Sequence, residues 1–137
     1  MSWGFVYVLG HHCMPDVYKI GFTERSPHLR CEELSKSTSA PGDFALICYA
    51  EYERAHDREQ EIHRLLGKYR VDAGREFFKC DLIHITDLVM DEEAASALCE
   101  LQMHAFLYAD SKVFHERRRI AEEMARDAGI ARSNESI

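Results

Sequence analysis

Three short runs of aromatic and β-branched residues in the first 53 positions constrain the fold of this chain more than any other feature. Residues 4–10 (GFVYVLG) and 17–23 (VYKIGFT) have the composition of β-strands, and the first run has a glycine at each end. The segment between them, HHCMPD, contains proline and aspartate, which predicts a hairpin with a long connection. Residues 44–53 (FALICYAEYE) are apolar for most of their length, which predicts a third strand, central in its sheet.

Two further segments have the pattern of short helices. Ser26 and Pro27 supply an N-cap and a first-turn proline, so a helix is expected over residues 27–37. Between residues 56 and 69 apolar side chains recur at intervals of three and four, which predicts an amphipathic helix with one buried stripe. The stripe consists of Ile62, Leu65, Leu66 and Tyr69. Residues 75–80 (REFFKC) then predict a short strand or turn.

The C-terminal part has a helical composition. Residues 85–131 contain no proline and are rich in Ala, Leu, Glu and Met, which predicts one long helix, or two helices that break near Asp110 and Ser111. The expected fold class is therefore α+β, with a small central antiparallel sheet flanked by helices and a C-terminal helical extension. We expect one domain over residues 1–80 and the helical extension over residues 81–137, packed on that domain or on a partner.

Length and composition limit the class of protein. A chain of 137 residues with 46% hydrophobic content is long enough for one compact domain with a core. No apolar run has the length that a bilayer requires, and the N-terminus lacks the pattern of a signal peptide. We expect a soluble, cytoplasmic protein with no membrane partner.

The five cysteines predict reduced, mostly structural thiols, because no pair has the two-to-four-residue spacing of zinc ribbons or fingers. Two weaker metal-site readings remain open. His11, His12 and Cys13 are consecutive in a loop, and Cys80 lies four residues before His84.

The net charge of −7 argues against a protein that coats nucleic acid by bulk electrostatics. The excess of negative charge is unevenly distributed along the chain. Residues 1–80 carry 11 basic and 12 acidic side chains, whereas residues 81–137 carry 6 basic and 12 acidic side chains. The first part is nearly neutral and has a basic stretch between residues 54 and 79. This distribution permits a local phosphate-binding face, although a solvated helix surface explains the same charges.

Several motifs occur in a specific order: a strand with a tyrosine (VYVL), a strand with Ile-Gly (YKIGFT), a helix with an arginine (HLRCEELS), then EIHRLLGKYRV and GREFF. This order resembles the GIY-YIG nuclease superfamily, and more narrowly its small branch in phages, bacteria and some meiosis-associated fungal proteins. The resemblance covers residues 4–80 and does not reach the C-terminal helices.

The resemblance implies roles for particular residues. Tyr7 matches the tyrosine of the first motif, Arg30 matches the helix arginine, and Glu59 is the best match to the metal-binding glutamate. In the second motif Lys19 stands where the second tyrosine is expected. Tyr18 lies one step earlier, on the opposite face of the strand, because side chains alternate. Whether Lys19 or Tyr18 takes the role of the second tyrosine stays open.

The implied chemistry suits these residue types. Phosphodiester hydrolysis needs a base for the attacking water and positive charge where negative charge develops. Tyr7 is expected to be the general base, and Arg30 and Lys19 to hold the phosphate. Glu59 offers a hard oxygen ligand for Mg²⁺ or Mn²⁺, and Glu76 in GREFF is the second candidate for the metal.

His63 lies four residues after Glu59, on the same helical face. Its imidazole either contacts the phosphate or leaving group, or makes a structural hydrogen bond.

Two functions follow. The first is a divalent-metal-dependent endonuclease acting on nucleic acid, with DNA as the expected substrate. The alternative is a catalytically weak nucleic-acid-binding or protein-assembly module that retains the nuclease fold. The apolar residues of the C-terminal helices further predict a homodimer, or docking to a larger protein complex, through residues 85–128.

Overall fold

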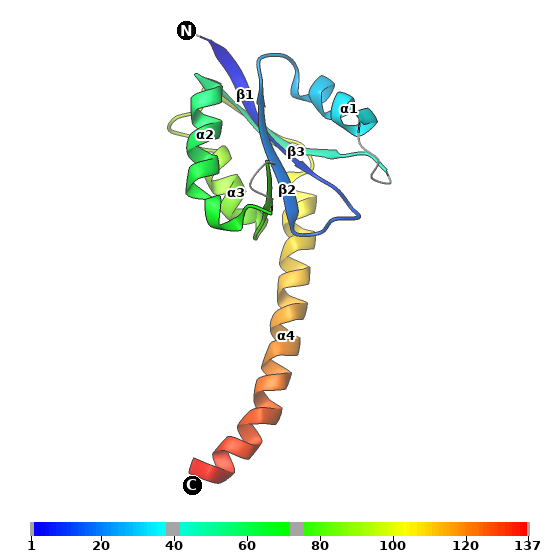
Figure 1. Cartoon of the computed structure of the whole chain (residues 1–137), viewed down its shortest axis with the longest axis vertical. Coiled ribbons are helices and arrows are strands. Elements are labelled where there is room, and N and C mark those ends of the chain that lie inside the picture. The colour runs from blue at the N-terminus through cyan, green and yellow to red at the C-terminus, as the bar shows by residue number, and fades with distance from the viewer. Residues whose placement is uncertain (1, 38–41, 72–75, 137) are drawn as a thin grey trace.

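The computed structural model describes residues 2–37, 42–71 and 76–136 and has an α+β architecture around an antiparallel sheet (Figure 1). Its strands are β1 (Trp3–Gly10), β2 (Val17–Thr23), β3 (Ala45–Glu53), β4 (Phe77–Lys79) and β5 (Ala97–Glu100). Its helices are α1 (Pro27–Ser37), α2 (Ala55–Leu65), the 3₁₀ helix η1 (Gly67–Tyr69), α3 (Leu82–Val89) and α4 (Met103–Ser136). The strand order within these residues is β4-β2-β1-β3-β5. The predicted fold class is confirmed.

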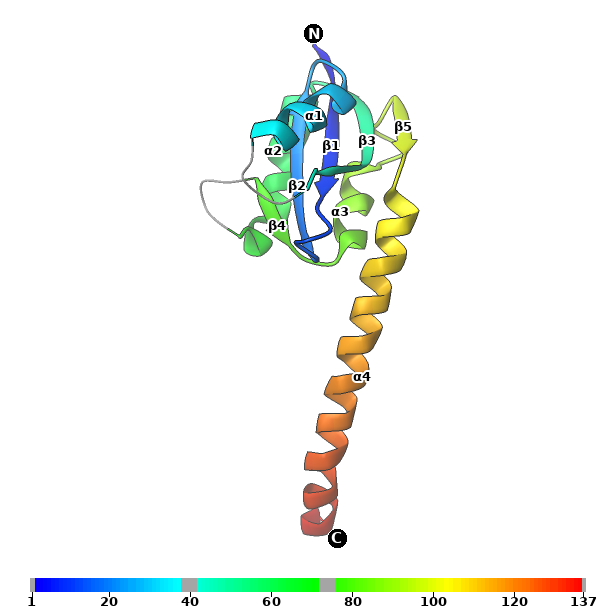
Figure 2. The same ribbon diagram turned by 90° about the vertical axis from the view of Figure 1, so that its right-hand side faces the viewer.

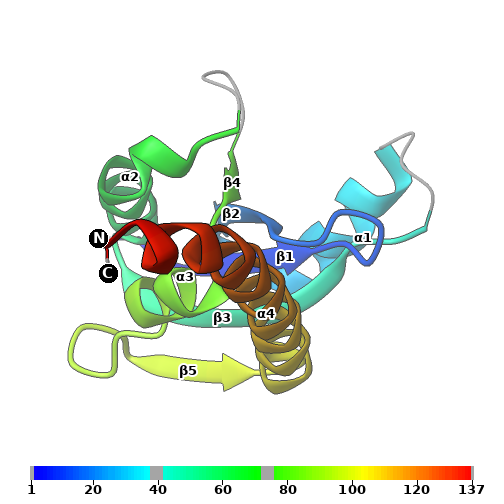
Figure 3. The same cartoon turned by 90° about the horizontal axis from the view of Figure 1, so that it is seen from below.

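Side chains alternate between the two faces of each strand, so the core is divided into two layers, one on each face of the sheet. Val6 and Val8 of β1 pack with residues of α2 and α3 on one face of the sheet. Tyr7 and Leu9 face the other side and pack with Cys31 of α1 in a smaller cluster. Seen from below, α1 lies apart from α2 and α3 with the sheet between them (Figure 3). The two faces are thus covered unequally, since a single short helix covers the side to which Tyr7 belongs.

The first three strands and the first helix lie where the sequence predicts them. β3 is interior, between β1 and β5, as its apolar composition indicates. The second helix is shorter than expected: α2 ends at Leu65 and a 3₁₀ turn follows. The predicted buried stripe is therefore wrong at Leu65, which is 46% exposed, while Ile62 and Leu66 are buried. Of the GREFF segment, Gly74 and Arg75 lie outside the described residues.

The purely helical prediction for residues 85–131 is wrong over part of its length. Residues 97–100 form β5, which pairs antiparallel with β3, with Tyr49 opposite Cys99. Pairing with the open edge of β3 satisfies backbone groups that would otherwise be unpaired, and this tertiary gain overrides a weak helical propensity. The sheet consequently includes a strand from beyond residue 80.

The predicted break near Asp110 and Ser111 is absent, because α4 is continuous through both residues. The Asp110 carboxylate accepts hydrogen bonds from the Tyr18 hydroxyl at 3.0 Å and from the backbone N–H of Leu82 at 2.9 Å. Its oxygens therefore bond to other elements and do not compete for the backbone of α4.

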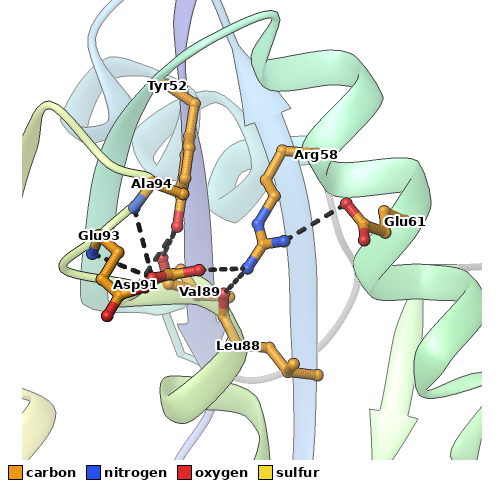
Figure 4. Close-up of polar contacts among 8 residues, drawn as sticks. All are labelled: Tyr52, Arg58, Glu61, Leu88, Val89, Asp91, Glu93 and Ala94. Atoms are coloured by element: carbon orange, nitrogen blue, oxygen red, sulfur yellow. Dashed lines mark hydrogen bonds and ion pairs between the residues drawn. The ribbon is translucent and has the colours of Figure 1, made fainter.

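A polar network fastens α3 to the rest of the domain (Figure 4). The Arg58 guanidinium on α2 donates to the Leu88 carbonyl at 2.7 Å and to the Asp91 carboxylate at 3.3 Å. The Tyr52 hydroxyl on β3 donates to the Val89 carbonyl at 2.6 Å. These bonds satisfy carbonyls in the last turn of α3, where a helix lacks internal partners.

Helix α4 leaves the domain and extends alone beyond it (Figures 1 and 2). Its first turns pack on the core through Met103 and Phe106. Farther along, Arg117 pairs with Asp16 of the domain. Beyond this pair, Ile120 and Met124 are exposed. Within the part of the chain that the structure describes, no helix combines the length and apolar content that a membrane crossing requires.

Candidate active site

The site begins with Tyr7, in the middle of the central strand. Its side chain faces α1 and is only 2% exposed. Its cross-strand partner is Gly21, and a Cβ atom at that position would collide with the Tyr7 ring and hydroxyl. The glycine of the second motif therefore lets the tyrosine lie across β2, near the point where β4 begins. A larger residue at position 21 would displace the ring.

Arg30 approaches the Tyr7 hydroxyl from α1. Its guanidinium pairs with Glu33 at 3.2 Å and lies close enough to the Tyr7 hydroxyl to lower the pKa of that group. Burial raises the pKa of Tyr7 above 10, while Arg30 lowers that pKa and the carboxylates of Glu76 and Glu59 raise it. Tyr7 is thus protonated at neutral pH in the free protein, and additional positive charge is needed to make it a base.

Glu59 lies on α2, is 1% exposed, and is close enough to Tyr7 for its charge to raise the pKa of that tyrosine. Its Oε1 accepts a hydrogen bond from the Gln60 side chain at 2.6 Å and lies 3.7 Å from Nδ1 of His63. Burial raises the pKa of Glu59, and the nearby Glu76 carboxylate raises the same pKa further. A buried carboxylate beside a second one is an environment that favours a bound cation.

His63 is 5% exposed, and its Nε2 lies 2.8 Å from the backbone carbonyl of Ile20. Because a carbonyl only accepts, Nε2 carries the proton and donates. With that nitrogen bonded to β2, only Nδ1 faces Glu59. Of the two alternatives for His63, this geometry is the structural hydrogen bond, which holds α2 against β2 and fixes the histidine beside Glu59.

Lys19 lies on the same sheet face as Tyr7, opposite Leu9 in the register of β1 and β2. Its Nζ pairs with the Glu76 carboxylate at 2.7 Å and lies 5.5 Å from the centre of the Phe77 ring. The Lys19 side chain is 12% exposed and that of Glu76 is 42% exposed. The ammonium group is therefore near the site and neutralised by a carboxylate that remains accessible to solvent.

Tyr18 belongs to the opposite face, as alternation predicts, and takes no part in this cluster. Its hydroxyl donates to Asp110 of α4, and burial followed by the Asp110 charge raises its pKa well above 10. Its position among the candidate catalytic residues is corrected accordingly: Tyr18 anchors α4. Lys19 is the residue of the second motif that lies near Tyr7.

Residues of the two weaker metal-site candidates, the loop at residues 11–13 and the pair Cys80 and His84, make other contacts. Nδ1 of His11 accepts from the Cys13 backbone N–H at 3.1 Å, while Nε2 of the same ring contacts the Gly42 carbonyl at 3.3 Å. Burial raises the pKa of Cys80 to about 11, which keeps the thiol protonated, and His84 stacks on Tyr69. His11 is thus occupied by hydrogen bonds, and a protonated Cys80 thiol is not a metal ligand.

The carboxylates of Glu59 and Glu76 fit a hard divalent cation better. Each carboxylate is close enough to raise the pKa of Tyr7, and Glu76 raises that of Glu59. Among the residues that the structure describes, no three or more His, Cys, Asp or Glu side chains converge on one point. This donor set suits Mg²⁺ or Mn²⁺, because Mg²⁺ keeps several waters and needs only one or two carboxylates.

Two participants were not identified from the sequence. Glu33 binds both Arg25, at 3.0 Å, and Arg30, and so orients the arginine beside Tyr7. Glu33 lies three residues after Arg30 on the same helix, and this spacing alone predicts that the two side chains are neighbours. Gln60, which donates to Glu59, has no such signal because adjacent helical positions do not normally face each other.

These features define an α+β domain in which a tyrosine on the central strand of an antiparallel sheet lies within electrostatic reach of an arginine and two glutamates. The T5orf172 domain matches residues 4–93, about two thirds of the chain, and the protein belongs to this family. The family has nuclease-like character related to the GIY-YIG nucleases. No curated protein and no solved structure matches the chain.

Proposed function

We propose that this protein is a divalent-metal-dependent endonuclease of the GIY-YIG type that hydrolyses phosphodiester bonds of nucleic acid, with DNA as the expected substrate. The observation that carries the proposal is the buried Tyr7 hydroxyl, which lies across Gly21 and within electrostatic reach of Arg30 and of the carboxylates of Glu59 and Glu76. This combination supplies a proton acceptor, a cation for the phosphate and oxygen ligands for a metal at one place.

In the proposed mechanism Arg30 binds the scissile phosphate through its fork of donors and stabilises the negative charge that develops there. Tyr7 takes the proton of the attacking water, and the positive charge of Arg30 favours the tyrosinate that this role requires. Glu59, with Glu76 as a second ligand, would hold Mg²⁺ or Mn²⁺. When bound, the metal supplies positive charge that lowers the pKa of Tyr7 and of the water.

The test is cleavage of supercoiled plasmid in Mg²⁺ or Mn²⁺, compared with the same reaction in chelator. Nicked or linear product that requires the metal supports the proposal. Stable DNA binding without cleavage in either metal would instead favour the alternative, a binding or assembly module that retains the fold.

Replacement of Lys19 is expected to lower the cleavage rate more than the stability of the fold. The Lys19→Met variant keeps an unbranched side chain and removes the charge, together with its contact over the Phe77 ring and its pair with Glu76. We expect the activation barrier to rise by about 2 to 4 kcal/mol, as for loss of one donor to a developing negative charge. Single-turnover cleavage rates measure the effect, and the melting temperature is the control. An unchanged rate would exclude Lys19 from the second-motif role.

We also propose that the exposed end of α4 mediates self-association, with a homodimer as the simplest form. Ile120 is 45% exposed and Met124 is 68% exposed, four residues apart on one helical face. Light scattering coupled to size exclusion at tens of micromolar should give a mass above the 15.9 kDa of one chain. The paired substitution of Ile120 and Met124 by Glu should restore the monomer mass. A wild-type mass of one chain would contradict the homodimer.

A further inference from the structure

The sheet face that carries Tyr7 continues past the site as an aromatic surface. Trp3, Phe5 and Tyr7 alternate along β1 and share this face. Tyr49 of β3 is the cross-strand partner of Tyr7 and belongs to the same side. Since α1 packs over Leu9 and Leu46 at the other end of these strands, the end that contains Trp3 and Phe5 is left partly open.

Three rings on this surface form a chain of contacts, and together with Trp3 on the same face they make what we call the aromatic patch: Trp3, Phe5, His28 and Tyr49. The Phe5 and Tyr49 rings are 5.4 Å apart and perpendicular, and the His28 and Tyr49 rings are 6.0 Å apart and also perpendicular. Trp3 is 51% exposed, His28 is exposed, and Phe5 and Tyr49 are half-buried. The patch therefore presents accessible π surface beside the tyrosine of the site.

The charges around the patch favour the base of a nucleotide over its phosphate. Glu51 and Glu53 are the cross-strand partners of Phe5 and Trp3 and lie on the same face. Carboxylates repel a phosphate backbone but accept hydrogen bonds from the amino groups of bases. Arg30 on α1 and Arg25 just before it carry positive charge, and both pair with Glu33 of α1. This separation suits bases over the sheet and phosphates along α1.

We propose that the aromatic patch binds unpaired bases of a nucleic-acid strand whose phosphate is held at Arg30. The inference rests on the proposed function and narrows its substrate to nucleic acid that is single-stranded, or locally unpaired, next to the cleaved bond. Stacking on aromatic rings requires exposed base faces, which a paired and stacked duplex does not offer.

Trp3 makes a direct test possible, because it is the only tryptophan in the sequence. The full-length protein is titrated in chelator, so that the strand is not cut, with a single-stranded oligonucleotide, its duplex, and a strand of equal length whose residues are abasic. Deoxyribose and ribose versions of the first strand separate DNA from RNA. We expect quenching of Trp3 fluorescence and tightest binding with the base-containing single strand.

Two variants accompany the titration, with binding followed by anisotropy of a labelled strand. Trp3→Ala should weaken binding of the base-containing strand about tenfold and leave the abasic strand unaffected. Trp3→Phe should restore most of the affinity. Tyr108→Ala removes an aromatic side chain that is 73% exposed on α4, away from the patch, and should change nothing.

The possible failures are distinguishable. Equal binding of the abasic and base-containing strands, with no effect of Trp3→Ala, would overturn the aromatic patch as a base site while leaving phosphate binding at Arg30 intact. Tighter binding of the duplex would overturn it as well. Absence of binding to every strand would overturn the proposed function together with this inference.

Discussion

Replacement of Tyr7 by Phe is expected to abolish strand cleavage while leaving the fold intact. The substitution removes one hydroxyl, and the buried ring stays in place across Gly21. Loss of a general base typically costs a factor of about 10² to 10⁴ in rate. Single-turnover cleavage in Mg²⁺ or Mn²⁺ measures the rate, and thermal unfolding measures stability, which should change little.

Tyr108→Phe is the control, because Tyr108 is 73% exposed on α4 and lies outside both the site and the aromatic patch. It removes an equivalent hydroxyl and keeps the ring, so cleavage should continue at nearly the wild-type rate. Arg30→Ala should lose activity as Tyr7→Phe does, since Arg30 is proposed to hold the scissile phosphate and its charge lowers the pKa of Tyr7. Full activity in Tyr7→Phe would remove the assigned base and with it the proposed mechanism.

The part of the site that lies within one sheet was predictable from the sequence. Alternation along a strand fixes which side chains share a face, so Lys19 was correctly separated from Tyr18 before their surroundings were known. The partners of these residues were not predictable. Tyr18 bonds to Asp110, 92 positions away, and only the packing of α4 on the sheet brings the two together.

Strand β5 could not be predicted from local sequence. Residues 97–100 read Ala-Leu-Cys-Glu, which local propensity assigns to a helix as readily as to a strand. What decides the outcome is the unpaired edge of β3, a property of the folded sheet. By contrast, β1 and β2 were recognised because their aromatic and β-branched residues favour strands in isolation as well as in the sheet.

Burial was the other property that the sequence did not reveal. Glu59 was expected as a metal ligand on a helix, but nothing in the pattern indicated that its carboxylate is 1% exposed. Solvation, more than position, sets how such a group behaves, because burial disfavours the charged form. The consequence is that the residue assigned to the metal also bears on the stability of the free protein.

Glu59→Gln is therefore expected to abolish metal-dependent cleavage and at the same time to stabilise the metal-free protein at neutral pH. Burial and the neighbouring Glu76 raise the pKa of Glu59 above its ordinary value of 4.5 in the folded state. A group with a raised folded pKa contributes stability below its unfolded pKa and loses that contribution as the pH rises through the folded pKa. At pH 7 the ionised carboxylate thus opposes folding, and the neutral amide, which can still accept from Gln60, does not.

Thermal unfolding of the two proteins in chelator measures this effect. The variant should be more stable at pH 7 by about 1 kcal/mol, the lower end of the cost of a buried polar group without full compensation, and should melt a few degrees higher. The difference should narrow as the pH falls through the folded pKa of Glu59 and vanish well below 4.5, where the carboxyl is protonated in both the folded and the unfolded state.

Mg²⁺ should raise the melting temperature of the wild type and not that of the variant, because ligand binding stabilises only the state that binds. Asp57→Asn, which removes an exposed carboxylate from the first turn of the same helix, is the matched control and should leave the response to Mg²⁺ unchanged. Equal melting temperatures at pH 7, together with an equal response to Mg²⁺, would show that Glu59 is neither destabilised by burial nor the ligand of the metal.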